Sequence, residues 1–147
     1  MIIWGKIESR LLLPEFVQDI NDLLGPCPYN WYVTEGFRSI ERSDALYAAY
    51  KAYLDKAGPP APRAAPGGKS AHNFGLAIDV ALDSDLHKPG LQPDWNPGID
   101  NGKADGWLWL RGKVNAHPRL RGGWWYADWP HIERYKWERH KDWKAAA

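Results

Sequence analysis

Three side chains of the kinds that bind zinc stand in two short segments of the sequence. His72 precedes an apolar run that contains Asp79, and His131 lies in a later run, between Asp128 and Glu133. Imidazole and carboxylate groups bind Zn²⁺ at about 2.0–2.2 Å, and three protein ligands leave a fourth position for water, as in catalytic sites. The sequence therefore predicts a catalytic metal site at His72, Asp79 and His131.

Asp79 is the most informative of these residues. Residues 75–82 alternate in the manner of a β-strand, with Ile78 and Val80 on one face. Asp79 lies between them, on a face that otherwise carries only alanine. A carboxylate in such a place is costly unless it is paired or binds a metal. An ion pair with a nearby arginine is the alternative to metal binding.

The second segment also predicts a strand, over residues 130–135, with His131 and Glu133 on one face. Pro130 argues against a helix interior, so this is not the helical two-histidine zinc motif. Asp128 must reach His131 through a bend before the strand. Asp128 is then the candidate to take a proton from water, and Glu133 is the runner-up, with orientation of a ligand as its other role. A loop aspartate and a satisfied strand histidine are the alternative.

A third segment supplies a cation. Arg38 lies between a predicted strand at residues 31–34 and a predicted helix at residues 40–56. A guanidinium held there can stabilise an oxyanion or bind a substrate carboxylate. A salt bridge to Glu41 or Asp44 is the alternative.

The remaining pattern predicts an α+β fold of short elements and long loops. The helix at residues 40–56 is expected to begin at a Ser39 cap and to bury a stripe of Ala45, Leu46, Ala49, Tyr53 and Leu54. Further predictions are helices over residues 14–24, 106–115 and 137–147, a surface loop over residues 58–69, a loop over residues 83–106 and a break at Gly122-Gly123.

The composition is that of a globular protein and suits one domain over residues 1–147. The net charge of +1 gives no broad case for nucleic acid, and the single Cys27 cannot build a disulfide or a cysteine-rich zinc site. The apolar runs near the start are too short for a signal peptide or a membrane span. Most of the 10 tryptophans are expected in the core or a cleft wall, with a minority stacking on sugar or peptide.

The first segment resembles a known motif. Ser70-x-His72-x-x-Gly75-x-Ala77-x-Asp79 is similar to the S-x-H-x-x-G-x-A-x-D motif of the D-Ala-D-Ala carboxypeptidase and L-alanyl-D-glutamate peptidase family. Members of this family are zinc hydrolases that cut the peptides of bacterial peptidoglycan. Many bacteriophage endolysins, which degrade the cell wall, belong to it.

Other segments extend the resemblance over roughly residues 34–133. Residues 128–131 resemble the second motif of the family, residues 36–39 its arginine segment, and residues 122–124 a Gly-Gly stretch upstream of the second motif. Residues 124–127, Trp-Trp-Tyr-Ala, depart from the acidic and polar residues common at that place, which puts substrate contacts in doubt but not the metal.

The resemblance implies a hedgehog/DD-peptidase-like fold, in which a small antiparallel sheet is flanked by helices and long loops surround a zinc cleft. It also implies roles for six residues: one Zn²⁺ on His72, Asp79 and His131, Asp128 as general base, Arg38 at the transition state, and Ser70 at the substrate cleft. His87, His117 and His140 have no part in it and are expected to be surface or structural residues.

The function expected from this likeness is that of a monomeric, bacteriolytic metallopeptidase acting on peptidoglycan stem peptides or cross-links. An L-alanyl-D-glutamate endopeptidase of a phage endolysin fits best, made in the host cytoplasm without a signal peptide and acting in the periplasm without a wall-binding module. A D-alanyl-D-alanine carboxypeptidase is the first alternative. A non-catalytic zinc-binding module that recognises the wall is the second, and the presence of Asp128 disfavours it.

Overall fold

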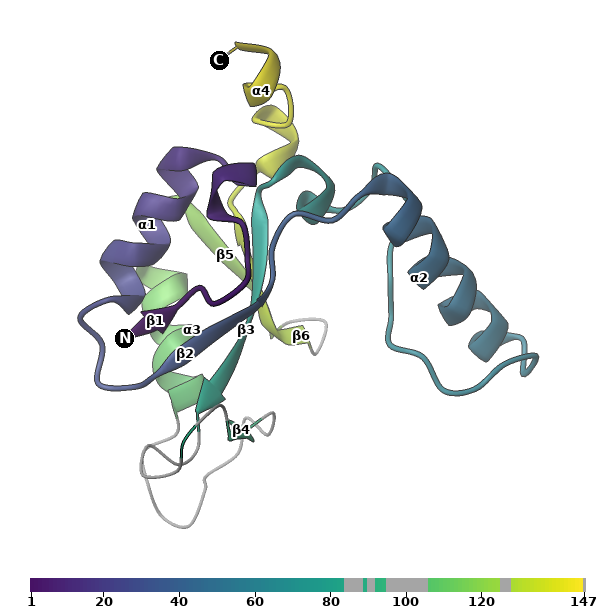
Figure 1. Cartoon of the computed structure of the whole chain (residues 1–147), viewed down its shortest axis with the longest axis horizontal. Helices are drawn as coiled ribbons and strands as arrows, with labels where there is room; N and C mark the ends of the chain where they lie inside the picture. The colour runs from purple at the N-terminus through teal and green to yellow at the C-terminus, as the bar shows by residue number, and fades with distance from the viewer. Residues whose placement is uncertain (84–88, 90–91, 95–105, 125–127, 147) are drawn as a thin grey trace.

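The computed structural model describes residues 1–83, 89, 92–94, 106–124 and 128–146 (Figure 1). Most of the predicted loop at residues 83–106 lies outside them, as does His87. The strands are β1 (Ile2–Ile3), β2 (Trp31–Glu35), β3 (Ala77–Asp83), β4 (Pro93–Asp94), β5 (Leu120–Gly123) and β6 (Asp128–Arg134). The helices are α1 (Pro14–Leu24), α2 (Ile40–Leu54), α3 (Gly106–Ala116) and α4 (Trp143–Ala146), with 3₁₀ turns η1 (Ser9–Leu11), η2 (Ala71–Phe74) and η4 (Trp137–Arg139).

The strands form one sheet with β3 and β6 at its centre. Its order is β1-β2-β3-β6-β5, and β4 pairs with β3 outside that path. The β1–β2 pair is parallel, and the other pairs are antiparallel. The predicted α+β class with a mostly antiparallel sheet is confirmed.

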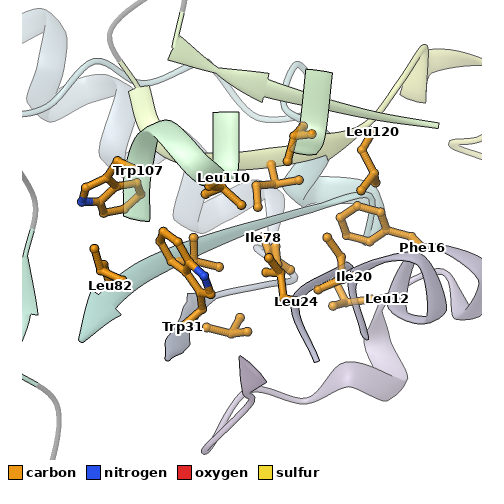
Figure 2. Packing of buried hydrophobic residues seen from close by; sticks show 14 residues of the cluster. Leu12, Phe16, Ile20, Leu24, Trp31, Ile78, Leu82, Trp107, Leu110 and Leu120 are labelled. Carbon is orange, nitrogen blue, oxygen red and sulfur yellow. The ribbon is translucent and has the colours of Figure 1, made fainter. Parts of the chain in front are cut away.

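The two faces of β3 have different surroundings, as the alternation of apolar and other residues along residues 75–82 predicts. Ile78 and Val80 are fully buried and join the main hydrophobic core, whereas Asp79 points to the opposite face. Figure 2 shows the core side chains of α1 and α3 meeting those of β2 and β3. Each large apolar side chain buried there contributes about 1.5–3 kcal/mol, so the core holds the strands that carry the opposite face in place.

Helix α1 has the predicted bounds, and its spacing explains why it packs here. Pro14 stands at its first turn, where a missing N–H costs nothing. Phe16, Ile20 and Leu24 follow at intervals of four, which places them on one face, and all three are buried.

Helix α2 begins as predicted but packs differently. The Ser39 hydroxyl accepts a hydrogen bond from the Arg42 backbone N–H at 3.1 Å, which confirms the cap. The predicted buried stripe is wrong, because α2 stands away from the sheet (Figure 1), and Tyr53 and Leu54 are 44% and 57% exposed. Of the whole helix only Ser43 is buried. Much of the predicted stripe is alanine, which has too little apolar surface to hold a helix against a core.

The two glycines lie at the end of strand β5, and the predicted break appears there as the end of the strand at Gly123 and a shift of the β5–β6 register between Gly122 and Gly123. The ring of Trp124 occupies the space that a side chain at position 122 would need. The glycine pair thus combines close packing in β5 with the end of that strand.

Residues 137–147 do not form the predicted single terminal helix. The described part contains η4 and the one-turn α4, and Lys136 before them has a left-handed backbone with φ of 55°. Trp137 stacks on Phe74, and the Trp143 indole N–H donates to the Phe74 carbonyl at 2.6 Å. Docking of both tryptophans at Phe74 decides the path of this segment, against the helical preference of its sequence.

The described tryptophans lie in the hydrophobic core or pack against it, as expected for most of them. Trp31 and Trp107 are fully buried and meet edge to face, with ring centroids 5.0 Å apart. The others are partly buried. Trp4, Trp109, Trp124 and Trp129 pack against the main core, and Trp137 and Trp143 pack against a second, smaller cluster of Ala71, Leu76 and Ala77. Within the described part of the chain, no helix combines the length and hydropathy that a bilayer crossing requires.

An ion pair between the buried Asp19 and the exposed Arg119 joins α1 to the residue before β5. Arg119 donates from Nε and Nη2 to the two carboxylate oxygens of Asp19, at 2.9 and 2.7 Å. The hydrogen bonds from Arg119 hold the pKa of Asp19 below its ordinary value. Because the folded state lowers this pKa, the pair stabilises the fold above the ordinary carboxyl pKa and loses that effect as the pH falls.

We therefore expect Asp19→Asn to lower the free energy of unfolding by about 1–3 kcal/mol near neutral pH. The difference from wild type should shrink below pH of about 4, where Asp19 itself becomes protonated in the unfolded chain. Urea unfolding of wild type and variant, near neutral pH and below pH of about 4, measures this difference in the free energy of unfolding. Asp22→Asn, at an exposed position on the same helix, is the control. The same pH dependence in both variants would contradict the assignment.

Candidate metal centre

Strand pairing brings the two predicted ligand segments together. Asp79 on β3 lies directly opposite His131 on β6 and, on the other side, opposite Glu35 at the end of β2. His72 comes from η2, the turn that leads into β3. The three predicted ligands thus come from three elements that meet on the face of the sheet opposite the main core.

The ligand atoms have a spacing that suits one ion. Asp79 Oδ1 lies 3.3 Å from His72 Nε2 and 3.3 Å from His131 Nδ1, and one ligand atom from each residue lies within 4.8 Å of the others. Tetrahedral zinc with bonds of about 2.0–2.2 Å separates its ligand atoms by about 3.3–3.6 Å. The residues present therefore fit a metal ion bound between them.

In both histidines, the ring nitrogen that faces away from Asp79, here called the outer nitrogen, has a hydrogen-bond acceptor beside it. The nitrogen that faces Asp79 is therefore available to bind a metal. His72 Nδ1 lies 2.8 Å from the Gly36 carbonyl oxygen, and His131 Nε2 lies 2.8 Å from Glu133 Oε1. Both partners can only accept, so each neutral ring carries its proton on the outer nitrogen. The unprotonated nitrogens then face Asp79, as metal ligation requires.

The charges at the site favour a cation. Burial alone would raise the pKa of Asp79, but His72 and His131 hold it far below its ordinary value, so the carboxylate is charged. Burial alone would lower the pKa of His131, yet Asp79 and Glu133 outweigh it and raise the pKa to about 10. Asp79 and Glu133 thus surround the His131 ring with negative charge, and a metal ion can take the place of the second ring proton that this charge favours.

Local sequence explains the shape of the turn that carries His72. The Ser70 hydroxyl accepts from the His72 backbone N–H at 3.3 Å, and the Asn73 side chain accepts from the Ser70 backbone N–H, also at 3.3 Å. This is a capping box. Gly75 ends the turn at φ of 69°, where a side chain would strike the Leu11 carbonyl. Ser70 thus positions His72, and its place at a substrate cleft stays a prediction.

Asn73 connects this turn to the segment of Arg38, a role that sequence reasoning missed. Its amide nitrogen donates to the Arg38 carbonyl at 3.0 Å and to the Ser43 hydroxyl at 2.8 Å. The Arg38 backbone N–H donates in return to the His72 carbonyl at 3.0 Å. The signal in the sequence that could have indicated this role is the polar Asn73 at a buried position of the first motif.

Arg38 lies at the site and is held by an acid that the sequence did not indicate. Its Nε and Nη2 donate to the two carboxylate oxygens of Glu35 at 2.7 and 2.6 Å, and Nη2 lies 3.9 Å from Asp79 Oδ2. The alternative of a salt bridge from Arg38 to Asp44 is wrong, because the Asp44 carboxylate accepts from the Gly67 backbone N–H instead. The Asp79–arginine pair therefore exists, but it is longer than the contacts of Asp79 with the two histidines.

Asp128 begins β6, rather than preceding the strand as expected. Gly123 pairs with Asp128 whereas Gly122 pairs with Ile132, so the predicted bend lies inside the strand, between Asp128 and His131. Burial raises the pKa of Asp128, and its carboxylate interacts electrostatically with His131, Asp79, His72 and Arg38. This group therefore lies near the same site.

Glu133, the runner-up for the base, is engaged elsewhere. It is buried and contacts both His131 and Arg121 at 2.8 Å. Burial alone would raise its pKa, but these two partners hold it below the ordinary value. An ionised carboxylate held between two donors suits orientation of His131 better than proton transfer. His117 and His140 are not part of the ligand cluster, as expected.

Comparison with known proteins identifies the family of this chain. The model of the VanY D-alanyl-D-alanine carboxypeptidase family matches residues 19–108, more than half of the chain, and the chain belongs to this family. The matched part includes Arg38, His72 and Asp79 but ends before β6.

One relative is the peptidoglycan L-alanyl-D-glutamate endopeptidase CwlK of Bacillus subtilis, 35% identical over 113 residues. The match covers 69% of this chain, and the chain spans only 58% of the length of CwlK. Two solved structures share the fold. The L-Ala D-Glu endopeptidase ChiX of Serratia marcescens has a TM-score of 0.58 and 19% identity, with 91% and 90% of the two chains covered. A mutant of the D,D-pentapeptidase VanY of a VanB-type resistance cassette, solved with Zn(II), has a TM-score of 0.50 and 18% identity, with 84% and 71% covered.

Gly123 gives a test of the strand irregularity. A Cβ at this position would lie 2.4 Å from the Asp128 carbonyl oxygen and about 3 Å from the Cβ atoms of Asp128 and His131 (3.0 and 3.1 Å). We expect Gly123→Ala to lower the free energy of unfolding by about 1–3 kcal/mol, because the backbone of β6 must move.

Gly112→Ala is the matched control, because nothing lies within 4 Å of a Cβ there and the residue is in helix α3. This change should stabilise the protein by up to about 1 kcal/mol. Chemical denaturation of both variants measures the effects. If Gly123→Ala is as stable as wild type, β6 does not pass Gly123 as closely as the structure describes.

Proposed function

We propose that this chain is a zinc-dependent peptidase that hydrolyses peptidoglycan stem peptides or cross-links, cutting as an L-alanyl-D-glutamate endopeptidase. The observation that carries the proposal is the convergence of the ligand atoms of His72, Asp79 and His131, with Asp128 and Arg38 close to them. Membership of the VanY family supports peptidoglycan as the substrate, and the solved VanY relative carries Zn(II).

In this proposal the ion is held by His72 Nε2, the Asp79 carboxylate and His131 Nδ1. Zinc supplies a Lewis acid that polarises the scissile carbonyl and makes water more acidic at the site. Asp128 takes the proton of the attacking water and passes it to the leaving amine, a role that its burial-raised pKa favours. Arg38, held by Glu35, offers donors to the oxyanion.

The names of the relatives favour an internal cut. CwlK, the relative at 35% identity, and ChiX are L-Ala-D-Glu endopeptidases, whereas the family model is described as a D-alanyl-D-alanine carboxypeptidase. The carboxypeptidase is therefore the second candidate. A non-catalytic wall-recognition module is disfavoured, because such a module has no need of a half-buried carboxylate at position 128. The phage origin and the action in the periplasm stay predictions.

The bond cut is the first thing to measure. Purified peptidoglycan digested with zinc-loaded protein should release stem peptides that begin with D-glutamate, identified by mass spectrometry. Chelation should abolish the release, and added zinc should restore it, because the ligands themselves remain intact. Loss of a terminal alanine alone would establish the carboxypeptidase instead, and intact peptides would refute the proposed activity.

Two substitutions separate the metal from the base. Asp128→Ala should keep zinc and lose hydrolysis by at least about 100-fold, because the proton acceptor is removed. His72→Ala should lose zinc itself. Zinc content by atomic absorption and release of soluble peptides measure the two effects, with Asp142→Ala, at an exposed position, as the control. Unchanged hydrolysis in Asp128→Ala would overturn the base, and full zinc content in His72→Ala would overturn the ligand set.

A further inference from the structure

Glu133 stands directly behind His131 and is held there from the neighbouring strand. Its Oε1 lies 2.8 Å from His131 Nε2, and its Oε2 accepts from Arg121 Nη2, also at 2.8 Å. Arg121 on β5 is the register partner of Glu133 on β6, so the sheet itself sets this contact. The Glu133 side chain is 5% exposed and that of Arg121 is 32% exposed. The carboxylate is therefore buried, and the partly exposed guanidinium lies between it and solvent.

We infer that Glu133 and Arg121 form a positioning pair that sets the tautomer of His131 and makes it bind the metal through Nδ1. The inference rests on the metal site of the proposed function. A neutral imidazole carries one N–H, and a carboxylate can only accept a hydrogen bond. With Glu133 behind Nε2, the proton stays on Nε2 and the lone pair of Nδ1 faces Asp79, 3.3 Å away.

Arg121 determines which groups Glu133 presents. A guanidinium can only donate, so the position facing Arg121 must be an acceptor. The carboxylate meets this demand and still presents a second acceptor to His131. Arg121 also provides the positive charge that a carboxylate buried at this depth requires.

The two histidines of the site are set by different means. The outer nitrogen of His72 meets a backbone carbonyl, that of Gly36, which no side-chain substitution removes. The outer nitrogen of His131 meets a side chain, so its tautomer depends on residue type at position 133. A substitution there tests the inference without altering any ligand of the metal.

The test is a double-mutant cycle on zinc affinity, measured by competition with a chelator for wild type, Glu133→Gln, Arg121→Met and the double variant. Beside Arg121, a glutamine must turn its amide oxygen to the guanidinium and its NH₂ to His131. This favours the wrong tautomer, and zinc should bind about 10- to 100-fold more weakly.

Without Arg121 the glutamine can turn round and accept from Nε2. We therefore expect Glu133→Gln to cost clearly less zinc affinity in the Arg121→Met background than in wild type. A role in packing alone would give equal losses in the two backgrounds. Glu138→Gln, at an exposed position, is the control and should bind zinc as wild type does.

A second measurement needs no variant. Nitrogen-15 spectra of the zinc-loaded wild type should show His131 bound through Nδ1 and protonated at Nε2. Binding through Nε2, or losses in Glu133→Gln that are equal in both backgrounds or below about threefold, would overturn the inference. If wild type binds zinc but gives one of these two results, the inference about Glu133 fails and the proposed function still stands. A wild type that binds no zinc would contradict both the inference and the proposed function.

Discussion

The pairing of β3 with β6 is the constraint on which the site depends. It sets Asp79 opposite His131 while Ile78 and Ile132, one step along, pair on the core face. A slip of one residue would turn the carboxylate into the core and the isoleucines out of it. Burial of the apolar face therefore fixes the register, and the register fixes the distance between two of the candidate ligands.

Charge balance is the second organising feature. The site holds acids that are costly to bury alone, and three of them meet nitrogen groups of other residues. Glu35 binds Arg38, Glu133 binds His131 and Arg121, and Asp79 lies between two imidazoles. The result is a set of fixed dipoles and charges around one point, which is the arrangement that catalysis of a charged transition state requires.

The fold was predictable where hydrophobic periodicity is strong. The bounds of α1 follow from its four-residue spacing, and the two faces of β3 follow from its alternation. The prediction failed where packing decides: α2 has an apolar pattern but stands away from the sheet, and residues 137–147 follow the docking of two tryptophans. Periodicity shows which face can be buried, but another element must be in place to bury it.

The sequence by itself determined which residue types stand ready for metal chemistry: His72, Asp79 and His131, with Asp128 and Arg38 in motifs of known spacing. Only the tertiary structure decided which atoms meet. The acid that holds Arg38, the amide of Asn73 and the Glu133–Arg121 pair became visible there. The physical reason is that spacing along a strand is local and periodic, whereas hydrogen-bond partners across strands and turns depend on register and packing, which the whole core sets.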